Sequence, residues 1–154
     1  MRLLRVLVPM MLAVVGVVGV EGTASSAPLV KQNFTLTSEN PEEPGGTVVA
    51  SGAINAVGED VVISDTEDQF VFPDGTLTII HAPVRGKEHF NEHTCTASFK
   101  ETGTYVISEG TGQYEGVTGS GTYRAAGRFQ SDCESEPTGS FTITARGSIN
   151  LPDA

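Results

Sequence analysis

Residues 108–123 read SEGTGQYEGVTGSGTY, and the glycines of this stretch decide which fold the chain adopts. Glycines spaced G-x-G-x-x-G at the start of a helix bind nucleotide phosphates, whereas glycines between two strands permit turns and bends. Here Gly110, Gly112 and Gly116 are spaced G-x-G-x-x-x-G, and an alternating, strand-like pattern follows in residues 119–123. A G-K-[ST] sequence is also missing from the chain. The stretch therefore predicts a connection between two β-strands and argues against a phosphate loop.

Alternating apolar and polar residues continue on both sides of this stretch, which is typical of strands with one buried face. Residues 120–129 and 140–149 show the alternation most clearly, and no window beyond the first 24 residues has helical periodicity. The further predicted strands are 33–37, 47–57, 61–72, 76–84, 93–100 and 103–110, with a short turn at Glu101-Thr102 between the last two.

Eight short strands in one small domain predict an all-β fold. Both a closed up-and-down barrel and a sandwich accommodate such strands. Closure leaves no exposed edge on long, Thr-rich strands, and this favours the barrel. We therefore expect a single closed antiparallel eight-stranded up-and-down β-barrel.

An export signal is predicted at the N-terminus, where Arg2 and Arg5 precede an uncharged run over 6–20 and small residues surround Ala24. This order is that of a cleaved secretory signal peptide. The apolar run is shorter than the ~20 residues needed to cross a bilayer, which disfavours a retained anchor. We expect a secreted, extracellular protein, or a periplasmic one in a Gram-negative cell. The expected segments are the signal peptide at 1–24, an extension at 25–32, the barrel at 33–150 and a tail at 151–154.

The mature chain is strongly acidic. Removing the signal takes away two of the nine basic residues and one of the nineteen acidic ones, which leaves seven and eighteen and a formal charge of −11. A chain of this charge has no long-range attraction to nucleic-acid phosphates or to anionic lipid. We therefore expect neither nucleic acid nor a membrane as a partner.

The two cysteines, Cys95 and Cys133, both fall in the mature part of the chain. An even pair in an exported protein predicts a disulfide. A metal site or a catalytic thiol is the alternative, but it needs further ligands or a partnered histidine.

Residues 104–127, TYVISEGTGQYEGVTGSGTYRAAG, resemble a segment of small bacterial proteins with the allene oxide cyclase barrel, a calycin-like eight-stranded fold. That segment has the order strand, G-T-G-x-[YF]-x-G-[VA]-x-G-x-G-T-Y, strand. Related barrels in plant allene oxide cyclases, dirigent proteins and bacterial spirotetronate cyclases bind apolar, often polyketide-like or oxylipin-like molecules and fold them toward one product. The resemblance implies such a barrel over residues 30–150, and with it a cofactor-independent cyclase or isomerase activity.

The string His89-Phe90-Asn91-Glu92-His93 fits H-x-x-E-H, a zinc-protease motif that requires both histidines on one helix face. The strand pattern that follows favours an extended segment, in which histidines four residues apart lie ~13 Å from each other and cannot share an ion. We interpret these residues as a solvated rim.

A calcium-binding loop is the second type of metal site that the sequence suggests. Its D-x-[DN]-x-[DN]-G order is missing from the acidic residues of 60–68, and we interpret them as surface acidity. These residues are Asp60, Asp65, Glu67 and Asp68. We expect no metal and no cofactor.

The interior of the barrel is the remaining candidate site, since an eight-stranded barrel is either filled by side chains or holds one small ligand. By alternation, the expected ligand-binding residues are Phe34, Leu77, Ile79, Phe99, Tyr123 and Phe141. Four polar residues share the apolar parity and are candidate proton donors or acceptors, namely Glu109, His81, Tyr105 and Tyr123. The alternative interpretation places Glu109 and His81 at a solvated rim and both tyrosines in the core.

Three functions fit these observations. The first is a secreted, non-enzymatic barrel that binds a small apolar ligand or persists as an extracellular domain. The second is a cyclase or isomerase that acts on an apolar substrate inside the barrel. The third is an interaction or inhibitor protein that acts through its loops.

Overall fold

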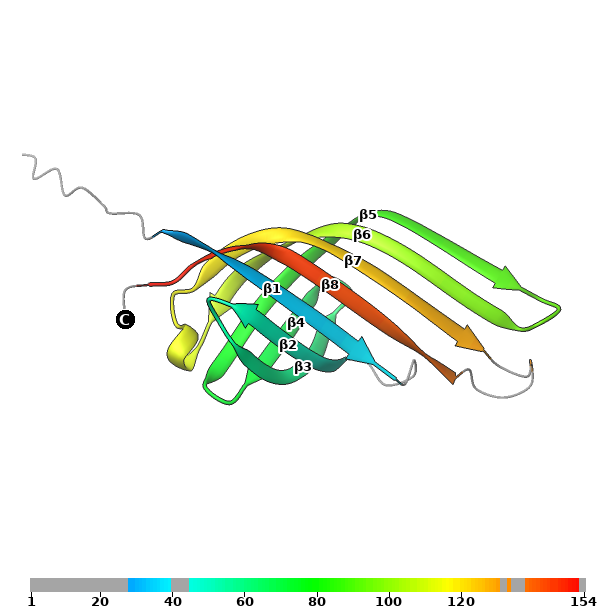
Figure 1. The fold of residues 1–154 in the computed structure, drawn as a ribbon, viewed down its shortest axis with the longest axis horizontal. Coiled ribbons are helices and arrows are strands. Elements are labelled where there is room, and N and C mark those ends of the chain that lie inside the picture. The colour runs from blue at the N-terminus through cyan, green and yellow to red at the C-terminus, as the bar shows by residue number, and fades with distance from the viewer. Residues whose placement is uncertain (1–27, 40–44, 131–132, 134–137, 153–154) are drawn as a thin grey trace, which may run out of the picture.

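The computed structural model describes residues 28–39, 45–130, 133 and 138–152, and these form one closed β-barrel (Figure 1). Each strand pairs antiparallel with its neighbour in sequence, and β1 also pairs with β8, which closes the barrel. The predicted all-β, eight-stranded up-and-down barrel is confirmed. The strands are β1 (Leu29–Ser38), β2 (Gly46–Gly52), β3 (Ala56–Ser64), β4 (Glu67–Phe72), β5 (Gly75–Asn91), β6 (Thr96–Gly110), β7 (Thr118–Gln130) and β8 (Thr138–Asn150).

The predicted number of strands is wrong in two regions, and the two errors cancel in the total of eight. The predicted strands 47–57 and 61–72 contain three strands, β2, β3 and β4. The predicted strands 93–100 and 103–110 are the two parts of one continuous strand, β6. Glu101 and Thr102 form no turn, because they pair with Gly86 and Arg85 of β5, which itself runs on to Asn91.

The glycine-rich stretch connects β6 to β7, as predicted. Its middle forms a single 3-10 turn over Gly112–Tyr114, and Gly112 and Gly116 have φ values of 62° and 78°. These left-handed conformations favour glycine, since a side chain would meet its own backbone there. The stretch therefore turns the chain between two paired strands.

The barrel is strongly asymmetric, because β5 to β8 have 13 to 17 residues whereas β2 to β4 have only 6 to 9. β4 pairs with β5 over Gly75–Ile80, and beyond His81 the rest of β5 has no paired strand on that side among the described residues. Figure 1 shows the long strands projecting beyond the short ones at the right. We call this projection the extended sheet. It comprises residues 85–91, 96–102, 124–130 and 138–144, which pair with one another in that order.

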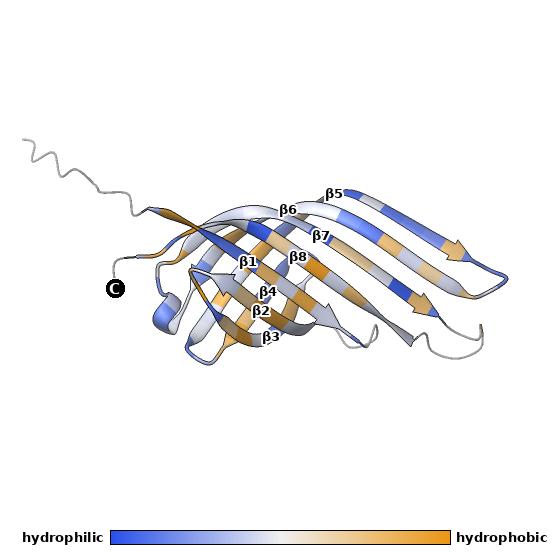
Figure 2. Ribbon diagram, viewed as in Figure 1, coloured by the Kyte–Doolittle hydropathy of each residue, from blue (hydrophilic) through white to orange (hydrophobic). Residues whose placement is uncertain are grey.

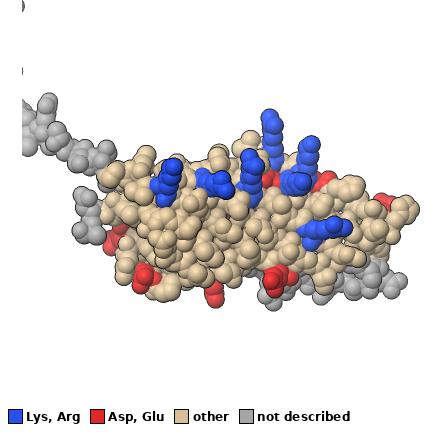
Figure 3. Space-filling view, in the orientation of Figure 1, with Lys and Arg blue, Asp and Glu red and all other residues tan. Residues whose placement is uncertain are grey.

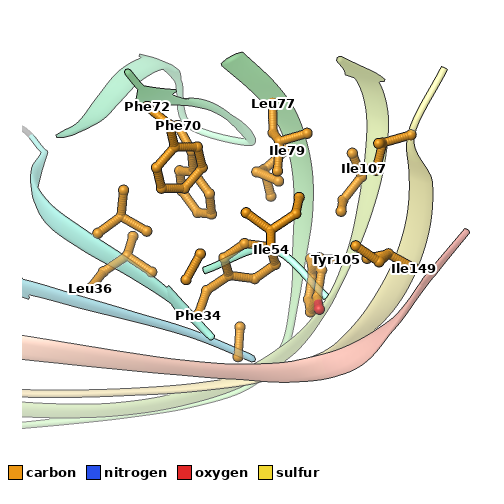
Figure 4. Packing of buried hydrophobic residues seen from close by; sticks show 14 of the residues in the cluster. Phe34, Leu36, Ile54, Phe70, Phe72, Leu77, Ile79, Tyr105, Ile107 and Ile149 are labelled. Atoms are coloured by element: carbon orange, nitrogen blue, oxygen red, sulfur yellow. The ribbon is translucent and has the colours of Figure 1, made fainter. Parts of the chain in front are cut away.

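The other end of the barrel is filled by a packed core. Leu77, Val117 and Ile149 are almost completely buried, and the ring of Tyr114 packs at 5.8 Å from that of Phe72. Figure 2 shows the alternation of hydrophobic and hydrophilic residues along the strands, and Figure 4 shows the apolar side chains meeting inside. Packing at this end closes the barrel, so the space inside opens toward the extended sheet.

A buried glutamine ties the β2–β3 turn to β1. The side chain of Gln32 accepts a hydrogen bond from the backbone N–H of Ile54 at 2.8 Å and donates one to its carbonyl oxygen at 3.1 Å. Gln32 is fully buried, so both bonds satisfy groups that water cannot reach. Gln32 belongs to β1, which begins at Leu29. Part of the predicted N-terminal extension at 25–32 is therefore the first strand of the barrel.

The basic residues are confined to one side of the molecule. Every Lys and Arg within the described residues is exposed on β1 or on β5 to β8, and Figure 3 shows most of the visible blue side chains along the upper edge. These residues are Lys31, Arg85, Lys87, Lys100, Arg124, Arg128 and Arg146. The interior of the barrel therefore contains no described Lys or Arg.

A disulfide joins Cys95 to Cys133, as predicted, with the two Cα atoms 5.4 Å apart. Cys95 lies in the β5–β6 turn and Cys133 between β7 and β8, so the bond clamps the far end of the extended sheet. Within the described residues no helix has the length and hydropathy to cross a bilayer. The predicted signal peptide at 1–24 lies outside the described residues.

Candidate functional site: an apolar cavity with two carboxylates

A cavity of about 260 Å³ lies between the closed end of the barrel and the extended sheet. Its walls are mostly apolar, and they include every predicted ligand-binding residue except Leu77, which is fully buried in the closed-end core. The apolar lining residues are Phe34, Leu36, Phe70, Ile79, Phe99, Tyr105, Tyr123, Ala125, Phe141, Ile143 and Ala145. Such a cavity is large enough for one small molecule.

Aromatic rings form much of the wall. The ring of Phe34 lies 5.3 Å from that of Phe70 and 6.2 Å from that of Tyr105, and Figure 4 shows these side chains pointing into the interior. On the extended sheet, Phe99 lies 6.5 Å from Phe141. These separations are typical of favourable ring pairs, which hold the wall in a fixed shape.

Glycines in β6 and β7 allow two of these rings to lie directly over the sheet. A Cβ atom on Gly103 would overlap the ring of Tyr123, and one on Gly127 would overlap the ring of Phe99. The absence of a side chain at both positions lets each ring approach the backbone closely. The glycines thus set the depth of the cavity and the positions of Tyr123 and Phe99.

One polar pair on the wall joins β4 to β5. The imidazole Nε2 of His81 lies 3.3 Å from a carboxylate oxygen of Asp68, and both side chains are largely buried. Burial raises the pKa of Asp68, and the facing His81 lowers it. The pair gives the cavity a carboxylate and an imidazole in contact, which is the combination that general acid–base chemistry uses.

A second polar pair joins β6 to β7. The hydroxyl of Tyr123 donates a hydrogen bond of 2.6 Å to Oε1 of Glu101. Burial, together with this bond, raises the pKa of Tyr123, so the phenol keeps its proton. The ring of Tyr123 also meets the ring of His81 edge-on at 6.0 Å. The two pairs are therefore neighbours on one wall, in the order Asp68, His81, Tyr123 and Glu101.

Two buried oxygen atoms near this wall have no hydrogen-bond partner among the described residues, Oδ1 of Asp60 and the hydroxyl of Tyr105. Burial, and secondarily the negative charge of Asp68, raises the pKa of Asp60 to about 7. Burial also raises the pKa of Tyr105. Of these two residues only Tyr105 lines the cavity, and its hydroxyl lies close to Gly147 of β8.

Three of the four candidate proton donors or acceptors line the cavity, namely His81, Tyr105 and Tyr123. Glu109 does not, because its side chain is exposed outside the barrel. A β-bulge explains why Glu109 faces outward although the predicted alternation places it inside. Thr78 pairs with Glu109 while its neighbour Ile79 pairs with Ile107, so one extra residue of β6 shifts the alternation.

The sequence interpretation missed three interior carboxylates. Asp60 and Asp68 are not surface acidity, since Asp60 is buried and Asp68 faces the cavity. Glu101, assigned to a turn, also faces the cavity from the middle of β6. A signal was present for Asp68, because it shares the parity of Phe70 and Phe72 in β4.

The H-x-x-E-H string lies at the far end of β5 and in the turn that follows, exposed to solvent as predicted. No group of three or more His, Cys, Asp or Glu residues in the described part of the chain is arranged to hold a metal ion.

Comparison with known proteins gives no match. No family model, no curated protein and no solved structure is significantly similar to this chain. The function is therefore argued from the residues of the cavity.

Proposed function

We propose that this protein is a secreted binding protein that holds one small apolar molecule inside its barrel. The observation that carries the proposal is the cavity of about 260 Å³, because its walls are largely aromatic and aliphatic while a few polar groups converge on it. The predicted export signal and the disulfide support an oxidising location outside the cytoplasm.

The proposal is tested with a neutral, naphthalene-based dye whose fluorescence rises in apolar surroundings. We expect saturable binding with about 1:1 stoichiometry, since one barrel offers one cavity. Ala125 and Ala145 both line the cavity, so Ala125→Phe fills it and abolishes binding. Overpacking costs roughly 1–3 kcal/mol of stability where a site is already filled and less where it is empty, so the variant should still fold.

Arg124→Phe is the matched control, because residue 124 adjoins Ala125 in β7 but is exposed on the outer face. This variant should bind the dye like the unmodified protein. If the unmodified protein binds no dye and Ala125→Phe unfolds it, the interior is packed solid. The binding proposal then fails, and the loops become the remaining place for function.

A cyclase or isomerase is the second candidate, and the Asp68–His81 pair is the observation that favours it. The imidazole of His81 would remove a proton from carbon beside a carbonyl group, and the same carbon would later regain one from solvent. Exchange of the C1 protons of 2-tetralone in deuterated water measures this chemistry. The activity is supported if exchange is catalysed and lost in His81→Gln while dye binding persists.

A further inference from the structure

The charged side chains that line the cavity are mainly acidic. Two carboxylates, Asp68 and Glu101, face a single imidazole, His81, and no Lys or Arg is among the residues that line the cavity. Asp68 is already paired with His81 at 3.3 Å. Among the residues that line the cavity, Glu101 is therefore the carboxylate that is paired with neither an imidazole nor a basic side chain.

Glu101 is placed to receive a hydrogen-bond donor from a ligand. Its Oε1 accepts one bond, from the hydroxyl of Tyr123 at 2.6 Å. An ionised carboxylate has about four acceptor positions on its two oxygens, so a single phenol leaves most of them unused.

The aromatic wall adds a second attraction for positive charge. Phe99 and Phe141 of the extended sheet, and Tyr105 and Tyr123 beside them, line the same cavity as Glu101. The face of an aromatic ring attracts a cation, and the gain rises where the cation is desolvated. A carboxylate in a partly enclosed aromatic site therefore favours a ligand with a cationic end and an apolar body.

We propose that the ligand is a small apolar amine whose protonated amino group binds Glu101 while its hydrocarbon or aromatic body packs among the phenylalanines. This inference rests on the proposed binding function and specifies its ligand class. The cavity, at about 260 Å³, lies just below the size usual for drug-like ligands, so the ligand is a compact molecule.

The test uses three probes with the same apolar body and different heads: 1-naphthylmethylamine, 1-naphthylmethanol and 1-naphthoate. Affinities are measured by calorimetry at pH 7 and 150 mM salt. We expect the amine to bind at least tenfold more tightly than the alcohol, and the carboxylate to bind most weakly. The ammonium group adds an attraction between opposite charges that the neutral alcohol lacks, and a tenfold difference in affinity corresponds to about 1.4 kcal/mol.

Glu101→Gln should weaken amine binding about tenfold and leave alcohol binding unchanged, since glutamine still offers Tyr123 an acceptor oxygen. Glu109→Gln is the matched control, because it removes the same charge from an exposed position outside the cavity. If both variants lose affinity equally, general attraction to an acidic protein explains the effect and the inference is wrong.

The outcomes separate the two proposals. If none of the probes binds, the binding function itself fails. If the alcohol or the carboxylate binds as tightly as the amine, the cavity binds apolar molecules but the amine assignment is overturned. The comparison of probes on the unmodified protein decides this even if Glu101→Gln does not fold.

Discussion

Asp60 is the residue whose ionisation most directly opposes folding. Burial, together with the negative charge of Asp68, raises its pKa to about 7, whereas an aspartate in an unfolded chain titrates near 3.9. Between these values the folded protein keeps a proton that the unfolded chain releases. The free energy of unfolding therefore falls as the pH rises through this window, and the loss is complete above about pH 7.

Asp60→Asn removes this dependence because an amide does not ionise. We expect the variant to gain stability relative to the unmodified protein by roughly 2–4 kcal/mol between pH 4 and pH 8. Urea unfolding at a series of pH values measures the difference. Asp65→Asn is the control, since Asp65 is exposed and its substitution should leave the profile unchanged. A constant difference between Asp60→Asn and the unmodified protein at all pH values would contradict the prediction.

The interior residues that the sequence predicts correctly are those whose strands keep a regular alternation. Phe34, Tyr123 and Phe141 face the cavity as expected, because no bulge intervenes between them and their apolar neighbours. Asp68 was missed for a different reason, because carboxylates are rarely buried and its residue type argued for the surface although its parity argued for the interior. Glu101 was missed because the prediction divides β6 at a turn that the structure does not contain.

At the scale of elements, the pairing of β5 with β6 places two positive charges directly opposite each other. Lys87 pairs directly with Lys100, and both side chains are exposed. Like charges at directly opposite positions destabilise a sheet, whereas opposite charges stabilise it by about 0.2–1 kcal/mol. Lys87→Glu should therefore raise the free energy of unfolding by about this amount at low salt, as measured by urea unfolding.

Lys31→Glu is the matched control for this pair. It makes the same change in net charge, but Lys31 pairs with Ser148 and faces no lysine in the register. High salt should reduce the gain in Lys87→Glu, because screening weakens interactions between exposed charges. Equal stabilisation by both variants would show that the register pair has no special effect.

Registers and bulges are the features of these elements that the sequence did not reveal. The bulge between Thr78 and Ile79 turns Glu109 outward, and a second irregularity lies between Pro83 and Arg85. Both arise from pairing between distant segments, and a local pattern of alternation carries no information about it. Regular alternation alone places Glu109 inward for this reason, whereas the alternative interpretation of Glu109 as a solvated residue agrees with its exposure.

At the scale of the whole molecule, closure of the barrel was predictable because it depends on strand number and on the need to cover strand edges. The unequal lengths of the strands were not predicted. The predicted strand 76–84 ends before Gly86, yet β5 continues to Asn91 because β6 satisfies its backbone groups. The extended sheet, and with it one wall of the cavity, follows from that continuation.

The disulfide should determine how stable this asymmetric molecule is. Cys95 and Cys133 are separated by 38 residues, and a loop of this size stabilises the folded chain by about 3–4 kcal/mol in the chain-entropy model. We expect the oxidised protein to contain no free thiol in an intact-mass measurement after alkylation, and two after reduction. Reduction should lower the free energy of unfolding by that amount.

The loss should begin at the extended sheet, because the bond joins the β5–β6 turn to the segment between β7 and β8. Hydrogen exchange on the reduced protein should therefore accelerate first in residues 85–102, while the closed-end core around Leu77 and Ile149 stays protected. The control is the double variant Cys95→Ser/Cys133→Ser, in which a reductant should have no effect. Uniform acceleration across both ends would mean that the barrel opens as one unit, and that the extended sheet gains no separate stability from the disulfide.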